Sequence, residues 1–285
     1  MSSINNKRIA KNTLFLYFRM LLIMLVTLYT SRIVLKALGI GDFGIYNVVA
    51  GFVSMLSFLN TSIANGFQRF FNFELGKEQI GKVKRMFSVS LSIQIGLSLL
   101  ILLLAETVGL WFLNASMNIP SDRIIAANWV YQSAVFMLII TLFRAPYDAI
   151  VIANEKMEFY AYIGICEVLF KFLIVYFLVK ISYDLLICYA ILMLLVTGGI
   201  FICYIFFAHK RFAYLRFSPV VDRGVMKQML GFSGWNILGS LAHLMKEQGA
   251  NILLNIFFGP TVNAARGIAF QIQSGVTVFV GNFQL

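Results

Sequence analysis

The segment "SRIVLKALGIGDFGIYNVVAGF" (Ser31–Phe52) joins two long apolar stretches through a turn rich in glycine. A stretch with the same order of features, "NILLNIFFGPTVNAARGIAFQI" (Asn251–Ile272), lies 220 residues further along, with Gly259 where the first has Gly39. Both run from an apolar helix into a glycine-marked turn and then into a second helix. The pattern predicts an internal repeat of helical units, a plan that many membrane transporters share.

The whole chain is apolar to a degree that soluble domains do not reach. Of its 285 residues, 60% are hydrophobic and only 12% are charged, whereas about a quarter of an average soluble domain is charged. A run of about 20 apolar residues is long enough to cross a bilayer. Such runs are predicted at 13–36, 45–66, 86–113, 124–144, 159–180, 184–208, 232–258 and 262–285. The sequence therefore predicts an all-α, polytopic integral membrane protein.

The connectors between these runs alternate in charge. Basic residues gather before the first run and in every second connector, which include Lys77, Lys82, Lys84, Arg85, Arg144, Lys156, Lys210, Arg211 and Arg216. Cytoplasmic loops carry an excess of Lys and Arg, so the N-terminus is expected in the cytoplasm. The net charge of +11 is then mainly a topology signal, with contact to anionic membrane lipids as an addition. This distribution argues against nucleic acid as a partner.

The repeat also predicts how the chain is divided. Residues 1–220 hold six predicted spans, an N-lobe, and residues 221–285 hold two spans that begin a C-lobe. Because the second copy stops after two spans, the sequence is expected to be the N-terminal fragment of a transporter of roughly twelve or more spans.

Several short patterns carry little chemistry in this setting. "GIGDFG" (Gly39–Gly44) matches a dinucleotide fingerprint, but that motif needs a strand before it, and here membrane helices flank it. An external turn is the better interpretation. His209 and His243 lack neighbouring carboxylates or cysteines, and the three cysteines form no C-x-x-C pair. No catalytic residue, metal or cofactor is therefore expected.

A polar stripe marks the seventh predicted span, around "LAHLMKEQGANILLNIFFG" (Leu241–Gly259). Residues three or four apart share a helix face, and this face carries Asn236, Ser240, His243, Glu247 and Asn251, with Lys246 at its border. Hydrocarbon cannot satisfy polar groups, so the stripe must face protein or water. His243, Lys246, Glu247 and Asn251 are therefore candidates for contact with a solute.

Other ionisable residues fall within predicted spans, where they are costly and tend to be functional. Glu167 and Lys171 are four residues apart, so they either neutralise each other or act on a solute. Arg19 and Arg266 have no acidic partner at helical spacing, although Arg19 lies off the α-helical face that carries Thr27 and Ser31. The surplus of cations favours an anionic solute, such as one that bears phosphate.

The segment Arg8–Lys77 has the order of features of a known family: a basic start, a first span, Leu38-Gly39, Asp42-Phe43-Gly44 and Ile45-Tyr46. "FSGWNILGSL" (Phe232–Leu241) and Gly259–Ile272 are similar to the opening of that family's second lobe. The chain resembles the polysaccharide-biosynthesis, or O-antigen, flippases of the multidrug/oligosaccharidyl-lipid/polysaccharide superfamily. The resemblance implies a two-lobe, MATE-like helical bundle with a complete six-helix N-lobe and the first two helices of the C-lobe.

The resemblance also implies an activity, which is not enzymatic. Such a protein moves a polyprenyl-pyrophosphate-linked oligosaccharide, an O-antigen, capsule or exopolysaccharide repeat unit, across the bacterial inner membrane by alternating access. Polysaccharide polymerase and export machinery are the implied partners. Arg19 and Arg266 lie on spans comparable to those that carry arginines in related lipid-precursor flippases, so they are the implied pyrophosphate contacts.

Two other classes of function are weighed against this one. A MATE-type, ion-coupled multidrug exporter would need surplus acid in its interior, for which Glu106, Glu167 and Glu247 are candidates. A membrane polymerase or acyltransferase usually shows a long external loop or a histidine-based motif, and neither is seen in the sequence.

Overall fold

The computed structural model describes residues 2–115, 117, 119–178, 183–212, 214–215, 222–242 and 246, without the side chains of residues 2–13, 15, 16, 19 and 28. The regular structure in these ranges is helical: α1 (Ser2–Ser54), α2 (Ser57–Gly76), α3 (Ile80–Leu104), the π-helical turn η1 (Ala105–Gly109), α4 (Leu110–Ala115), the 3-10 turn η2 (Ser121–Arg123), α5 (Ile124–Ala153), α6 (Met157–Leu178) and α7 (Leu185–Arg211). A further helix covers residues 223–242. The expectation of an all-helical protein is confirmed.

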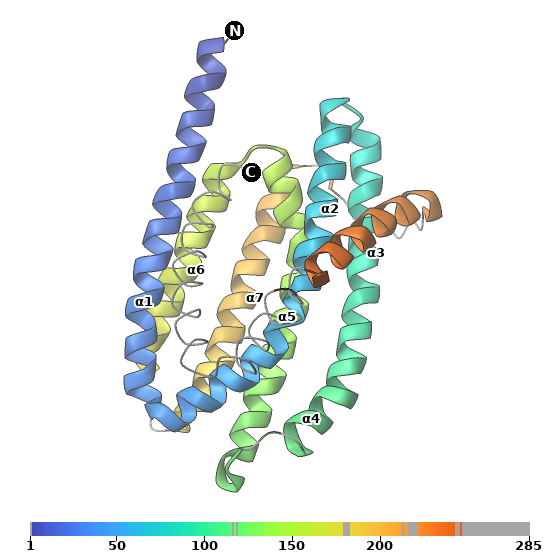
Figure 1. Cartoon of the computed structure of the whole chain (residues 1–285). Coiled ribbons are helices and arrows are strands. Elements are labelled where there is room, and N and C mark those ends of the chain that lie inside the picture. Colours follow the sequence, from blue (N-terminus) through green and yellow to red (C-terminus); the bar gives the residue numbers. More distant parts are fainter. Residues whose placement is uncertain are drawn as a thin grey trace.

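The helices run between two ends of a bundle, as Figure 1 shows. The start of α1, the α2–α3 connection, the α5–α6 connection and the end of α7 lie at one end. This basic end carries Lys77, Lys82, Lys84, Arg85, Lys156, Lys210 and Arg211. The bend of α1, η2 and the start of α7 lie at the opposite end (Figure 1). The alternation of charge along the sequence is thus a difference between the two ends of the bundle.

Five stretches of the described chain are long and apolar enough to cross a membrane: Met20–Ser54, Ile80–Ala115, Ser121–Ala153, Met157–Leu178 and Leu185–Arg211. Large apolar side chains such as Leu99, Leu103, Ile202 and Phe206 are more than half exposed on these helices. Contiguous exposed apolar surface of this kind suits hydrocarbon and not water. The fold is that of a multi-pass membrane protein.

The predicted span at 45–66 is interrupted, and in this the prediction is wrong. α1 continues to Ser54, a turn follows in which the amide of Leu56 donates to the carbonyl of Val53 (3.1 Å), and α2 begins at Ser57. The turn expected around Gly39 is a kink inside α1, where Gly39 has φ 77° and ψ 170°. Only glycine adopts this left-handed backbone without steric cost.

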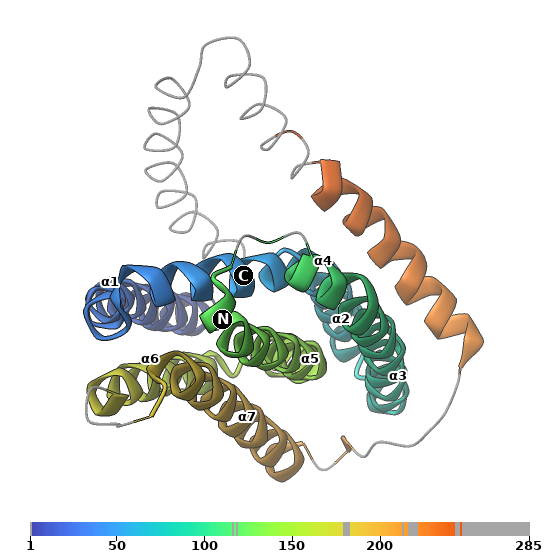
Figure 2. The ribbon, with the colours of Figure 1, turned by 90° about the horizontal axis from the view of Figure 1, so that it is seen from below.

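The helices pack around α5, which lies between α1, α2 and α7 in the view along the bundle (Figure 2). One buried cluster joins α1, α5 and α7 through residues such as Val49, Tyr131 and Leu186. A second cluster, nearer the basic end, contains Phe67, Phe87 and Ile150. α5 contributes residues to both clusters and is therefore the central helix of the bundle.

Candidate functional site

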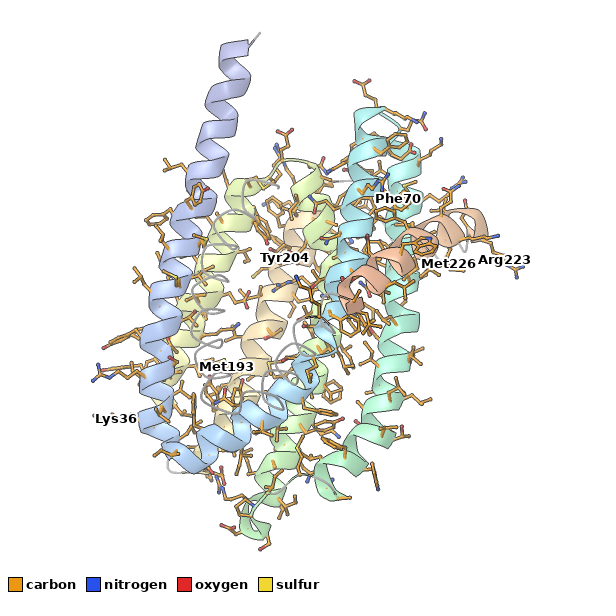
Figure 3. All side chains as sticks on the ribbon, viewed as in Figure 1. Lys36, Phe70, Met193, Tyr204, Arg223 and Met226 are labelled. Carbon is orange, nitrogen blue, oxygen red and sulfur yellow. The ribbon has the colours of Figure 1, made fainter. Side chains whose placement is uncertain are left out.

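A cavity of about 310 Å³ opens between α1, α5, α6 and α7. Part of its wall can donate or accept hydrogen bonds, through Thr27, Thr30, Ser31, Tyr46, Asn47, Lys171 and Tyr189. The rings of Tyr46 and Tyr189 meet edge to face, with centroids 4.8 Å apart. Apolar side chains such as Val34 and Met193 complete the wall; Figure 3 labels Met193 on α7. The helix face with Thr27 and Ser31 therefore borders a mostly apolar space that has polar groups on part of its wall.

Four charged side chains form an interior charge network beside this cavity. Arg144 Nε lies 3.1 Å from Asp148 Oδ2 within α5, and Arg144 Nη1 lies 3.3 Å from Glu167 Oε2 on α6. Glu167 Oε1 also accepts a hydrogen bond from Lys171 Nζ at 2.7 Å. The guanidinium carbon of Arg144 is 5.5 Å from the ring centroid of Tyr204 on α7. Lys171 both belongs to the network and lines the cavity.

The network corrects one sequence-based prediction and shows the contact behind another. The sequence pattern assigns Arg144 to a connector, but α5 continues past Pro146 to Ala153 and places Arg144 inside the bundle. The signal available in the sequence is the four-residue spacing of Arg144 and Asp148, which lets the two side chains pair on one helix face. Glu167 and Lys171 form an ion pair in this structure, at 2.7 Å. Two cations and two carboxylates leave the network with no net formal charge.

A second ion cluster, the outer clasp, lies at the end opposite the basic end. Arg123 in η2 donates from Nε to Asp42 Oδ1 (2.8 Å) and from Nη1 to Asp184 Oδ2 (2.7 Å), and its Nη2 contacts both carboxylates. Asp184 also caps α7, because Oδ1 accepts from the amides of Leu186 and Ile187 at 3.0 and 3.2 Å. The clasp thus ties the segment after the α1 kink to the starts of α5 and α7.

The outer clasp sets the ionisation of Asp184. Partial burial acts to raise the pKa of Asp184, but the hydrogen bond from Arg123 and those from the two backbone amides outweigh this effect. The pKa of Asp184 therefore lies below the ordinary value for a carboxyl. This direction is the one expected when hydrogen bonds and a nearby cation favour the charged form.

The 223–242 helix packs on α2 along a contact that we call the α2 seam. Ser62 Oγ lies 2.8 Å from Ser240 Oγ, and the guanidinium of Arg69 lies 4.4 Å from the ring centroid of Phe232. Gly66 allows this approach, because a Cβ at that position would lie 2.7 Å from Ser233 Oγ. Figure 3 labels Phe70 on α2 and Met226 and Arg223 on the 223–242 helix. Ser240, a member of the predicted polar stripe, thus contacts protein at this seam.

Most of the other candidate residues lie outside the described residues. This holds for His243, Glu247, Asn251 and Arg266. The backbone of Arg19 is part of α1, but its side chain is not described. Lys246 is exposed. Within the described ranges, no group of three or more His, Cys, Asp or Glu residues could hold a metal ion.

Membrane-length helices around an internal cavity, with charges paired inside the bundle, define a multi-pass membrane protein. Solved structures share this fold. A multidrug resistance MATE-family transporter of the MOP superfamily, in an outward-facing conformation, matches with a TM-score of 0.77 at 15% identity, over 97% of this chain and 62% of that chain. The crystal structure of a MATE point mutant matches with the same score, identity and coverage.

A MOP-superfamily transporter from Pyrococcus furiosus also matches, with a TM-score of 0.73 at 15% identity over 97% of this chain and 62% of that chain. It is described as having a binding pocket of reversed polarity that suggests a different function. The chain spans about 62% of the length of these transporters. No family model and no curated protein matches the chain. The chain therefore has the fold of MATE-family transporters.

Proposed function

We propose that this chain forms the N-terminal lobe, and the start of the second lobe, of a transporter that moves polyprenyl-pyrophosphate-linked oligosaccharides across the bacterial inner membrane by alternating access. The observation that carries the proposal is the position of Lys171, a cation on the wall of a cavity whose other polar groups are hydroxyls, an amide and tyrosines. Sugars are recognised by such neutral donors and acceptors, and phosphates by a cation.

The interior charge network explains how Lys171 can turn to an anionic solute. Glu167 accepts from both Lys171 and Arg144, so Glu167 keeps a counter-ion when Lys171 moves away. A carboxylate left unpaired inside the bundle would be costly. Because Glu167 is shared with Arg144, that cost is lower when Lys171 leaves. Lys171 is therefore the member of the network that can change its partner. Arg19 and Arg266 remain the proposed contacts for the pyrophosphate.

The proposed transport needs no covalent step, so the protein is proposed to act without catalytic residues or a cofactor. The basic end is proposed to face the cytoplasm, which puts the N-terminus there, because Lys and Arg are enriched in cytoplasmic connectors. Polysaccharide polymerase and export machinery are the proposed partners.

A MATE-type, ion-coupled multidrug exporter is the second candidate function. It is favoured by Glu167, which lies one hydrogen bond from the cavity-lining Lys171. A cationic solute could replace Lys171 as a partner of this carboxylate. The MATE transporter fold is compatible with both functions.

The test is a deletion strain supplied with the full-length gene, as wild type, Lys171→Gln, Arg266→Ala or the control Lys36→Gln. The readout is the amount of lipid-linked oligosaccharide that faces outward. Wild type and Lys36→Gln should restore it, because Lys36 is exposed near the α1 kink and does not line the cavity. Lys171→Gln and Arg266→Ala should restore clearly less at equal protein abundance. Normal translocation in the deletion strain would refute the proposal.

A further inference from the structure

A second cavity lies on the outer face of the bundle, in a groove between the start of α6 and the end of α7. Its volume is about 760 Å³. Phe159 and Ile163 on α6 are four residues apart, as are Ile202 and Phe206 on α7, so each pair shares one helix face along the groove. The rings of Phe159 and Phe207 stack at 3.6 Å with an interplanar angle of 6°. These rings give the groove a rigid aromatic wall.

The groove is open toward the surroundings of the bundle. Ile202 is 66% exposed and Phe206 is 68% exposed, within a helix of membrane-spanning length and hydropathy. The surroundings at this depth are therefore lipid chains and not water. From Ile202 to Arg211 the helix rises about 14 Å, so the groove reaches from the end of α7 well into the apolar zone.

Two adjacent cations close the groove at the basic end. Lys210 and Arg211 are exposed, and both line the cavity. Lys210 Nζ lies 5.8 Å from the ring centroid of Phe206, which holds the ammonium above the apolar part of the groove. Neither cation makes an ion pair within the described part of the chain. Cations at the C-terminus of a helix also stabilise the helix dipole. That role does not account for the apolar groove that leads away from Lys210 and Arg211.

We propose that this groove binds an anionic phospholipid of the leaflet at the basic end. Its acyl chain lies between Phe159 and Phe206, and its phosphate contacts Lys210 and Arg211. Long basic side chains reach from apolar surface to the headgroup level, and anionic headgroups attract Lys and Arg near the surface. A zwitterionic lipid could fill the apolar part equally well, but it lacks the net charge that complements the two cations. Figure 1 shows the start of α6 and the end of α7 together at this end.

The test measures lipid retention by the full-length protein in detergent with native mass spectrometry. The probes are phosphatidylglycerol and phosphatidylcholine with identical acyl chains. Wild type should prefer phosphatidylglycerol. Lys210→Gln/Arg211→Gln should lower the affinity for phosphatidylglycerol at least about tenfold, from the attraction per cation, and leave phosphatidylcholine unchanged. Cys203→Trp keeps the cations but fills the apolar groove, so it should weaken both lipids; Cys203 is exposed, so the added ring does not enter the core.

The matched control is Lys82→Gln/Lys84→Gln, which removes two exposed cations at the same end without touching the groove. This variant should keep the preference for phosphatidylglycerol, and excess inorganic phosphate should not displace the bound lipid. Equal retention of both lipids by wild type would overturn the proposal. So would an equal loss in the control variant, or complete displacement by phosphate, which would indicate a site for the headgroup alone. Equal melting temperatures exclude unfolding as the cause.

Discussion

Glu167 is the residue on which the interior of the bundle depends. It accepts from Arg144 of a neighbouring helix and from Lys171 of its own helix, and its side chain is 21% exposed. Arg144 keeps Asp148 as a second partner, whereas Glu167 is the one ion-pair partner of Lys171 in the described part of the chain. The arrangement explains how these four charges are tolerated inside the bundle: each is paired across or along helices.

Replacing Glu167 with Gln should therefore destabilise the protein. Removing one partner of a fully buried ion pair costs about 3 kcal/mol, and the cost here should be smaller because the Lys171 side chain is 36% exposed. Glu167→Gln should lower the melting temperature of the full-length protein in detergent. The double variant Glu167→Gln/Lys171→Met should recover most of the loss, because it removes the orphaned ammonium as well. A double variant no more stable than Glu167→Gln would show that the pair is not coupled.

The outer clasp predicts a dependence of stability on pH. The pKa of Asp184 is lower in the folded protein than its ordinary value. The carboxylate therefore stabilises the fold above the unfolded pKa of about 3.9, and this contribution is lost as the pH falls through the lower, folded pKa. Asp184→Asn should flatten the acid side of a curve of melting temperature against pH. Asp122→Asn, a change at an exposed neighbour of Arg123, should leave the curve as in wild type.

At the scale of elements, the kink of α1 at Gly39 is the feature that shapes the bundle. It turns the chain between the two parts of α1 at the end where Asp42 enters the outer clasp. The glycine pattern around residue 39 predicts a change of direction here. The break between α1 and α2 escapes prediction because its residues, Met55 and Leu56, are as apolar as the helices on either side.

Gly39→Ala should destabilise the protein, because a Cβ disfavours the φ of 77° by about 1–2 kcal/mol. Gly44→Ala is the control. Gly44 is helical, and an added Cβ there meets nothing within 4 Å, so the change should be neutral or stabilise by up to about 1 kcal/mol. Melting temperatures of the two variants test this difference. Equal effects would mean that the kink does not require glycine.

The α2 seam can be tested by cross-linking. In a variant without Cys166, Cys188 and Cys203, the pair Ser62→Cys/Ser240→Cys should form a disulfide on mild oxidation, because the two Oγ atoms are 2.8 Å apart. Gly66→Val should lower the yield, since even a Cβ there would approach Ser233. Gly81→Val, on α3 with nothing within 4 Å of an added Cβ, should not. Absence of a cross-link in the parent pair would contradict the packing of the 223–242 helix on α2.

For the whole molecule, the sequence is most informative where one uninterrupted apolar run forms one helix. The runs at 159–180 and 184–208 agree closely with α6 (Met157–Leu178) and α7 (Leu185–Arg211). The interior charge network is harder to predict. The sequence pattern assigns Arg144 to a connector because charge and Pro146 interrupt the apolar run, and its partner Glu167 lies on another helix. The spacing of residues along the sequence indicates contacts within one helix. It does not indicate which side chains of different helices pair with each other.

The two candidate functions differ in the residue that would contact the solute. A flippase for anionic, lipid-linked oligosaccharides would use Lys171 toward the solute, and a multidrug exporter would use Glu167. The MATE transporter fold is compatible with both functions, so the solute that crosses the membrane decides between them.

The most direct measurement reconstitutes the full-length protein in vesicles and follows two fluorescent solutes, a lipid-linked oligosaccharide and an organic cation, with and without a proton or sodium gradient. The proposed function predicts that the oligosaccharide crosses the bilayer faster than in protein-free vesicles, that Lys171→Gln slows it, and that the cation does not cross. Gradient-driven movement of the cation, with the lipid-linked oligosaccharide left in its original leaflet, would contradict the proposed function and identify an exporter.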